Sequence, residues 1–311
     1  MKKFLLVFLL FLSLIAIFAD YRKEYDDLYR VKFKDNWLFL NEKGDVVIKI
    51  PTTDFDDAGN FIEGRGFVSK KIKNIEYDII GADFYYKIVN LAIINSKNKI
   101  IKTFNEPVLI LDFDGETNAS YIPEFYKGYA KISFVKTDNI KKIKKYSQVK
   151  TEDKYVDING NFVDKNNIPK DIQEMLNKEM FPRERFEYNQ NLISKDMKCE
   201  QNTDNTCFGY TDKSGNIKIP PVWNADFIGC GDWYAKNQYF YNDRAVAFIQ
   251  ENKREGYLDG YYIFIDTNGK PVNNKKYIYA EPFYRKLTMV VFKNETRAYI
   301  NTDGNVVWRD Y

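Results

Sequence analysis

The stretch Phe208-Gly-Tyr-Thr-Asp-Lys-Ser-Gly215 decides the fold, because its spacing of an aromatic residue, an Asp and a Gly recurs along the chain. Such self-similarity predicts a repeat architecture. The last interval between copies, from Gly269 to Gly304, is shorter than the others. The six copies occupy residues 37–44, 91–98, 153–160, 208–215, 262–269 and 297–304.

Each copy has the residue types of a β-hairpin turn. An Asp or Asn that opens a type I turn can accept hydrogen bonds from the backbone N–H groups that follow it. The final position favours Gly, or Asn, because a bulged hairpin needs a left-handed residue there. The predicted turn pairs are Asn41 with Gly44, Asn95 with Asn98, Asp157 with Gly160, Asp212 with Gly215, Asp266 with Gly269 and Asn301 with Gly304.

A second element recurs downstream of most hairpins and combines an aromatic residue, a polar turn and an alternating strand. This pattern predicts a corner followed by one more strand. Each unit would then contain a hairpin, a linker, an aromatic corner and a strand, which makes three to four short strands. The corner segments are residues 61–68, 125–132 and 186–193, with looser versions that start at Tyr241 and Phe283.

The run GYTDKSGNIKIPPVW, from Gly209 to Trp223, resembles the WG repeats of many bacterial exported proteins. The resemblance extends from about Tyr29 to Tyr311, although Trp stands at its column only as Trp37 and the following Gly only as Gly209. It implies a β-rich repeat scaffold that serves in interaction and has no general catalytic residues.

We therefore predict an all-β fold in which residues 20–311 form one repeat domain of about five antiparallel units plus a terminal hairpin. A propeller-like ring and an open β-repeat stack both fit, and the short last interval favours the ring. One short helix insert is expected in residues 169–181, where Ile172, Met175, Leu176 and Met180 follow helical spacing. This helix would pack on the sheets, with partner binding as the alternative.

The N-terminus has the layout of a secretory signal peptide over residues 1–19. Lys2 and Lys3 precede an apolar run from Phe4 to Phe18 that is too short to span a bilayer, and Ala19 is a plausible cleavage residue. We expect an exported protein of the periplasm, the cell surface or the medium, with no membrane span after cleavage. An uncleaved N-terminal anchor is the alternative.

Export predicts that cysteines pair, because the compartment is oxidising. Cys199 and Cys207 flank a polar loop and are the first choice for a disulfide that closes a hairpin. Cys207 with Cys230 is the competing pair. One of the three cysteines is left over in either case.

Composition excludes several classes of catalyst. The 311 residues contain no His, so the chain has no Ser-His-Asp triad and no His-ligated metal site. We expect no cofactor and no metal, and we interpret the calcium-like runs at Asp54–Asp57 and Asp112–Glu116 as turn carboxylates. A formal net charge of +3 gives no reason to expect a nucleic-acid partner. Residues 141–145, which contain four Lys, are interpreted as a solvated loop tip rather than a binding patch, because acidic residues follow closely.

Aromatic residues make up 17% of the chain, and most of them are explained by strand packing. Five lie close together in sequence and could form an exposed row that stacks on sugars or anchors a protein partner. This binding hypothesis concerns Trp223, Trp233, Tyr234, Tyr239 and Tyr241.

The expected function is that of a non-enzymatic scaffold whose partner is a protein or a cell-envelope glycan. Carbohydrate or cell-wall binding through the aromatic cluster is the alternative. A third hypothesis is a carboxylate-based glycoside hydrolase or lyase, which needs two converging carboxylates, one of them with a raised pKa.

Overall fold

A computed structural model describes residues 27–76, 84–113, 122–137, 139–177, 188–198, 206–224, 239–254 and 257–310. The chain divides into two compact units, Met1–Met180 and Phe181–Tyr311, whereas the sequence analysis treated residues 20–311 as one domain. The leader, Cys199 and Cys230 lie outside the described residues, so the signal peptide and the disulfide stay predictions.

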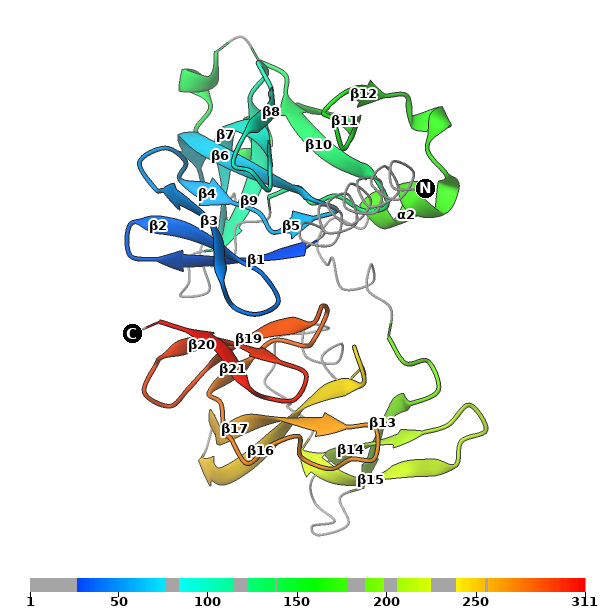
Figure 1. Ribbon diagram of the computed structural model, residues 1–311. Helices are drawn as coiled ribbons and strands as arrows, with labels where there is room; N and C mark the ends of the chain where they lie inside the picture. The colour runs from blue at the N-terminus through cyan, green and yellow to red at the C-terminus, as the bar shows by residue number, and fades with distance from the viewer. Residues whose placement is uncertain are drawn as a thin grey trace, which may run out of the picture. The chain divides into compact units, whose positions relative to one another are not determined.

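The first unit confirms the all-β prediction (Figure 1), because it consists of three antiparallel groups of three strands. Two strands join these groups into a single sheet of the described residues: β5 (Phe61–Ile62) and β9 (Val108–Phe113). A third short strand, β4 (Asp57–Ala58), pairs with the second group alone. The three groups are β1 (Asp27–Phe33), β2 (Asn36–Leu40) and β3 (Val46–Pro51); β6 (Arg65–Ile75), β7 (Phe84–Asn95) and β8 (Ile100–Thr103); and β10 (Tyr129–Val135), β11 (Thr151–Asp157) and β12 (Phe162–Val163).

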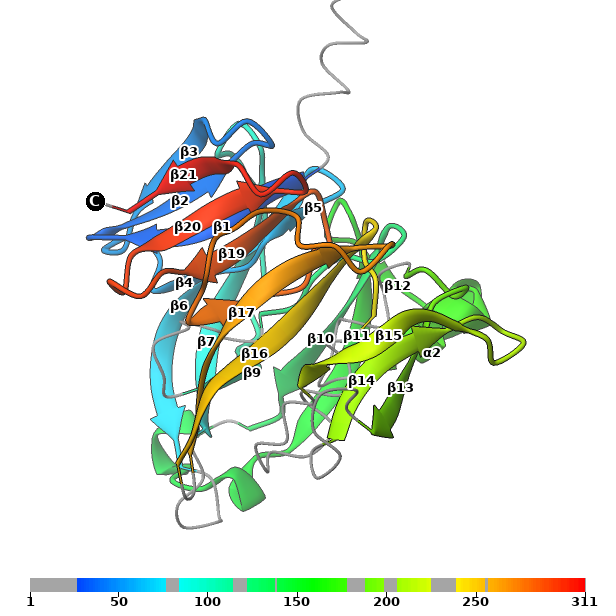
Figure 2. The same ribbon diagram turned by 90° about the horizontal axis from the view of Figure 1, so that it is seen from below.

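The second unit repeats this plan in two separate sheets of its described residues. Figure 2 shows its long β16–β17 hairpin, whose third strand is reduced to a bridge between Ile265 and Pro271. The five-stranded sheet contains β13 (Ile193–Lys198), β14 (Thr206–Thr211), β15 (Ile217–Asn224), β16 (Arg244–Arg254) and β17 (Tyr257–Asp266). The four-stranded sheet contains β18 (Tyr279–Ala280), β19 (Leu287–Val291), β20 (Arg297–Asn301) and β21 (Val306–Arg309).

The pairing of the corner strands changes the boundaries of the repeat. Each corner strand pairs with the hairpin that follows it, as β6 does with β7, β10 with β11, and β19 with β20. The hairpin that was expected to end the chain alone therefore has its own corner strand, β19. The described strands form six such groups, and the choice between a ring and an open stack stays a prediction.

The recurring aromatic columns form the cores of both units. The residue two positions before each turn Asp or Asn is buried, and the corner aromatic packs against it. The ring centroids of Phe39 and Phe61 are 4.8 Å apart, and those of Phe264 and Phe283 are also 4.8 Å apart. Contacts of this kind join one repeat to the next through apolar burial.

One corner was assigned to the wrong residue in the sequence. Phe240, not Tyr241, occupies the column of Phe61 and Phe125, and its ring centroid lies 4.8 Å from that of Tyr210. The two-residue turn that follows confirms the shift, since Asn242 and Asp243 both have positive φ, as Lys127 and Gly128 do. Both residues are buried, so the two registers are distinguished by the turn conformation and by the contact with Tyr210.

The predicted helix insert is α2 (Lys170–Asn177). Ile172 and Leu176 are buried beside Tyr155 and Ile168, which agrees with packing on the sheet. Short 3-10 turns lie at η1 (Ile140–Lys142), η2 (Tyr146–Gln148) and η3 (Lys165–Asn167). Within the described ranges, no helix is both long and apolar enough to cross a bilayer.

Candidate functional site

The six repeated turns share one hydrogen-bond pattern. In each turn, the side-chain oxygen of Asp or Asn accepts from the backbone N–H groups two and four residues later. Asp212, for example, accepts from Ser214 and Asn216, at 2.9 Å in both cases. The same two bonds are made by Asn41, Asn95, Asp157, Asp266 and Asn301.

The last residue of each turn has a left-handed backbone. Asn98 has a φ of 56°, and the five glycines have φ values between 75° and 85°. A Cβ on Gly304 would lie 1.9 Å from the Asn273 side chain, so this glycine is also needed for the close approach of two repeats. The glycines are Gly44, Gly160, Gly215, Gly269 and Gly304.

These hydrogen bonds lower the pKa values of the turn carboxyls. The side chain and backbone of Asn216 lower the pKa of Asp212 to about 2. Burial alone would raise the pKa values of Asp157 and Asp266, but backbone N–H donors outweigh it and both pKa values lie below the usual range. The turn residues thus serve to hold the fold.

Corner arginines connect neighbouring repeats in each unit. Arg65 Nε donates to the carbonyl of Ile158 at 3.1 Å, and Arg244 Nε donates to that of Thr302 at 2.7 Å. Both carbonyls belong to the residue directly after a turn Asp or Asn. The two units therefore use the same inter-repeat bond.

The predicted aromatic cluster is only partly described. Trp233 and Tyr234 lie outside the described residues, and Trp223 is placed by its backbone alone, opposite Phe208. Tyr241 is 2% exposed, with ring centroids of Tyr188 and Tyr284 at 6.2 and 4.8 Å, so this ring belongs to the packing of the unit.

An exposed aromatic pair that the sequence analysis missed lies next to Tyr241. Tyr188 is 39% exposed, and its ring centroid is 4.6 Å from that of the half-buried Tyr239. The two ring planes are tilted by 32° to each other. The sequence signal for Tyr188 was its place in the segment 186–193, which was predicted to form a corner and a strand.

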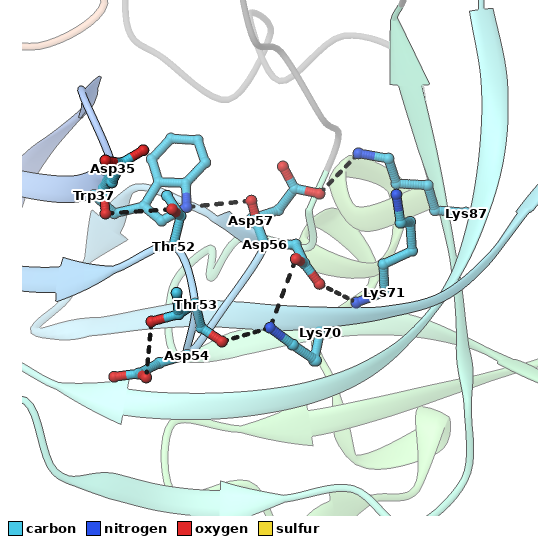
Figure 3. A network of polar contacts seen from close by, with 10 residues as sticks. All are labelled: Asp35, Trp37, Thr52, Thr53, Asp54, Asp56, Asp57, Lys70, Lys71 and Lys87. Carbon is cyan, nitrogen blue, oxygen red and sulfur yellow. Dashed lines mark hydrogen bonds and ion pairs between the residues drawn. The ribbon is translucent and has the colours of Figure 1, made fainter.

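The carboxylates of the first calcium-like run, at Asp54–Asp57, have protein partners (Figure 3). Asp56 accepts from the backbone N–H of Lys71 at 2.7 Å and lies 3.7 Å from Lys70 Nζ. Asp57 pairs with Lys87 Nζ at 2.9 Å, and both residues are buried. This network ties β4 to strands β6 and β7 through groups of opposite charge.

Two other carboxylates form an exposed square of charges on the first unit. Lys154 Nζ lies 2.8 Å from Glu106 and 3.6 Å from Glu152, while Lys136 contacts the same two carboxylates. The hydrogen bond from Lys154 lowers the pKa of Glu106, and the one from Lys136 lowers the pKa of Glu152. A general acid for glycoside cleavage needs the opposite direction of shift.

A lysine-rich surface lies on the first unit at residues 139–150, which we name the lysine loop. Ile143 is 5% exposed and anchors the loop beside Ile75, Ile88 and Val135. Lys73 Nζ donates to the carbonyls of Lys141 and Ile143, which fastens the loop to β6. The exposed cationic residues are Lys141, Lys142, Lys144, Lys145 and Lys150.

Comparisons with known proteins do not assign the chain to a family. No protein-family model matches the chain, and no curated protein matches it. It is similar to the crystal structure of the eukaryotic initiation factor at 9% identity and a TM-score of 0.29, covering 92% of this chain and 86% of that one. It is also similar to apo AztD from Citrobacter koseri at 8% identity and a TM-score of 0.18, covering 92% and 82%. TM-scores this low carry no inference about function.

Proposed function

We propose that the chain is an exported, non-enzymatic repeat protein of the WG type that binds a protein or a glycan of the cell envelope. The observation that carries this proposal is that the residues that recur along the chain have structural roles. Turn carboxylates and amides accept backbone N–H groups, turn-column and corner aromatics are buried, and two corner arginines bond to neighbouring turns. The side chains of the recurring residues are used in hydrogen bonds and packing within the scaffold, so the surface between them is available for binding.

Carbohydrate binding is the second candidate, and the Tyr188–Tyr239 pair favours it. Two rings in contact, one of them 39% exposed, offer an apolar face with polar edges. Sugar rings stack on faces of this kind, and aromatic residues concentrate binding energy where they are exposed.

The test is a pull-down with the protein purified after export from its full-length gene. Envelope extract of the producing cell is one arm, and purified cell-wall glycan is the other. Capture of a saturable protein partner without glycan retention supports the scaffold. Retention on glycan that is lost in Tyr188→Ala and Trp233→Ala supports the carbohydrate reading.

A matched variant separates loss of binding from loss of folding. Tyr241→Ala removes a buried ring from the same region and is expected to destabilise the unit. Tyr188→Ala, on an exposed ring, is expected to keep the circular dichroism spectrum of the native protein. If neither arm retains the protein, the binding function is overturned.

A further inference from the structure

The lysine loop is held in one conformation by bonds that do not involve its exposed charges. The Tyr146 N–H donates to the carbonyl of Glu76 at 3.0 Å, and the Glu76 N–H donates to that of Lys144 at 3.3 Å. Gln148 Oε1 accepts from the N–H of Lys144 at 2.7 Å. The backbone is thus ordered before any ligand arrives, which reduces the entropy that binding must overcome.

Four like charges are concentrated on this ordered segment. Lys141 and Lys142 precede the buried Ile143, and Lys144 and Lys145 follow it, so the four ammonium groups lie on both sides of one anchor. Among the described residues, no carboxylate lies within ion-pair distance of any of the four. Mutual repulsion makes such a cluster costly unless an anion neutralises it.

The acidic residues that follow in sequence do not neutralise the loop. Glu152 pairs with Lys154 on the same strand, β11, and with Lys136 directly after β10, and Asp153 lies 3.1 Å from Lys131 on β10. The interpretation of residues 141–145 as a solvated loop relied on these acids. Because their partners lie on β10 and β11, the positive charge of the loop is left exposed.

The residue types indicate what kind of anion fits. The exposed cations of the loop are all Lys, which binds phosphate as a point charge. They follow one another along the chain on both sides of Ile143, as the charges of a linear polymer would. Tyr146, 37% exposed and stacked on Tyr86 at 4.1 Å, adds an aromatic face at the end of the lysine series.

We propose that the lysine loop binds a flexible polymer with repeated phosphate groups. Several lysines would each neutralise one phosphate, and the release of counterions from the polymer would drive association. This inference rests on the proposed binding function and names the chemistry of one partner. A small phosphate ion would meet a single ammonium at a time and is expected to bind weakly.

The experiment measures the anisotropy of fluorescently labelled long-chain polyphosphate against the exported protein over a series of salt concentrations. The test variant is Lys141→Gln with Lys142→Gln, Lys144→Gln and Lys145→Gln. The control carries the same loss of charge at dispersed exposed positions, Lys43→Gln, Lys49→Gln, Lys99→Gln and Lys213→Gln. Circular dichroism of both variants checks that they fold.

We expect the native protein to bind polyphosphate at low salt, with an affinity that falls as salt rises. The test variant should bind at least about tenfold more weakly, and its salt slope should fall by about one for each contacting lysine that is removed. The affinity of the control variant for polyphosphate should stay within about twofold of that of the native protein, because salt screens charges that lie far from the binding surface. Equal losses in the two variants, or no binding by the native protein, would overturn the proposal.

Two further measurements complete the test. The first distinguishes a phosphate polymer from a phospholipid surface, and the second distinguishes failure of this inference from failure of the proposed binding function. Binding to phosphatidylglycerol vesicles without binding to polyphosphate would overturn the polymer in favour of a lipid surface. Envelope capture that survives in the test variant, together with no polyphosphate binding by the native protein, would overturn this inference while the binding function stands. Polyphosphate binding that the test variant loses would support it.

Discussion

The two compact units build the same three-stranded repeat but connect their repeats differently. In the first unit, β5 pairs with β1 and β6, and β9 pairs with β7 and β10, so the linkers complete one continuous sheet. In the second unit, the described ladder between the first two groups is the single pair Asn224 and Phe248, and the third group forms its own sheet. The motif therefore specifies the repeat, while the linkers specify how repeats are joined.

The largest expected effect comes from the corner aromatics, one in each unit. Phe61→Ala and Phe240→Ala each remove a fully buried ring and should lower the free energy of unfolding by about 3–5 kcal/mol. Hydrogen exchange followed by mass spectrometry would locate the loss of protection. We expect each variant to lose it only in its own unit.

The control for this pair is Phe162→Ala, because Phe162 is 53% exposed and its loss should have a much smaller effect. If either corner variant lowers protection in both units alike, the units unfold together. That result would favour the single domain expected over residues 20–311.

The next effect tests the buried ion pair of the first unit. Asp57→Ala leaves the Lys87 ammonium buried without this partner, which should cost about 3 kcal/mol of stability. Replacing both residues by apolar ones, Asp57→Leu with Lys87→Met, should restore much of that loss. Urea unfolding of the single and double variants measures the coupling.

The exposed pair of the same network is the matched control. Lys70 and Asp56 are 44% and 36% exposed in their side chains, so Lys70→Met should cost less than about 1 kcal/mol. An Asp57→Ala variant as stable as Lys70→Met would show that the buried pair does not hold β4 in place.

The smallest effect concerns acid. The second unit has carboxylates in two turns, at Asp212 and Asp266, whereas the first has one, at Asp157, beside the amide turns of Asn41 and Asn95. Because the folded pKa values lie below the unfolded value of about 3.9, these turns stabilise fully above that pH. Their contribution is lost as the pH falls from about 4 toward 2.

The variant Asp212→Asn with Asp266→Asn should therefore move acid unfolding of the second unit to lower pH. Asn41, Asn95 and Asn301 already make the same turn bonds, so the substitution should preserve the hairpins. Circular dichroism during acid titration in high salt measures the shift, because salt screens the exposed charge square at Glu106 and Glu152. An unchanged midpoint would contradict the role of the turn carboxylates.

The turns could be predicted because their chemistry is local. Asp212 and the N–H groups it accepts from lie within five consecutive residues, so the sequence contains the whole pattern. The corner at Tyr241 was placed one residue late, because two adjacent aromatics satisfy the same pattern. Only the conformation of the turn and the contact with Tyr210 identify Phe240. The helix was recognisable from its apolar spacing, although the described helix covers only Lys170–Asn177 of the expected span.

The candidate site was less accessible from sequence. Tyr188 and Tyr239 form a pair although they are far apart along the chain, and Tyr241, expected to be exposed beside Tyr239, is buried. The charge of the lysine loop was judged from the acids that follow it. Pairing across β10 and β11 gives those acids other partners, which no reading of neighbours along the chain would reveal.

By itself, the sequence determined the all-β class, the hairpin turns and the aromatic columns, because each depends on contacts within a few residues or on a period. Only the tertiary structure decided the division into two compact units, the pairing of Asp57 with Lys87 and the partners of the acids that follow the lysine loop. These features depend on residues brought together from distant positions. Their energies come from burial and charge in three dimensions, which spacing along the chain does not encode.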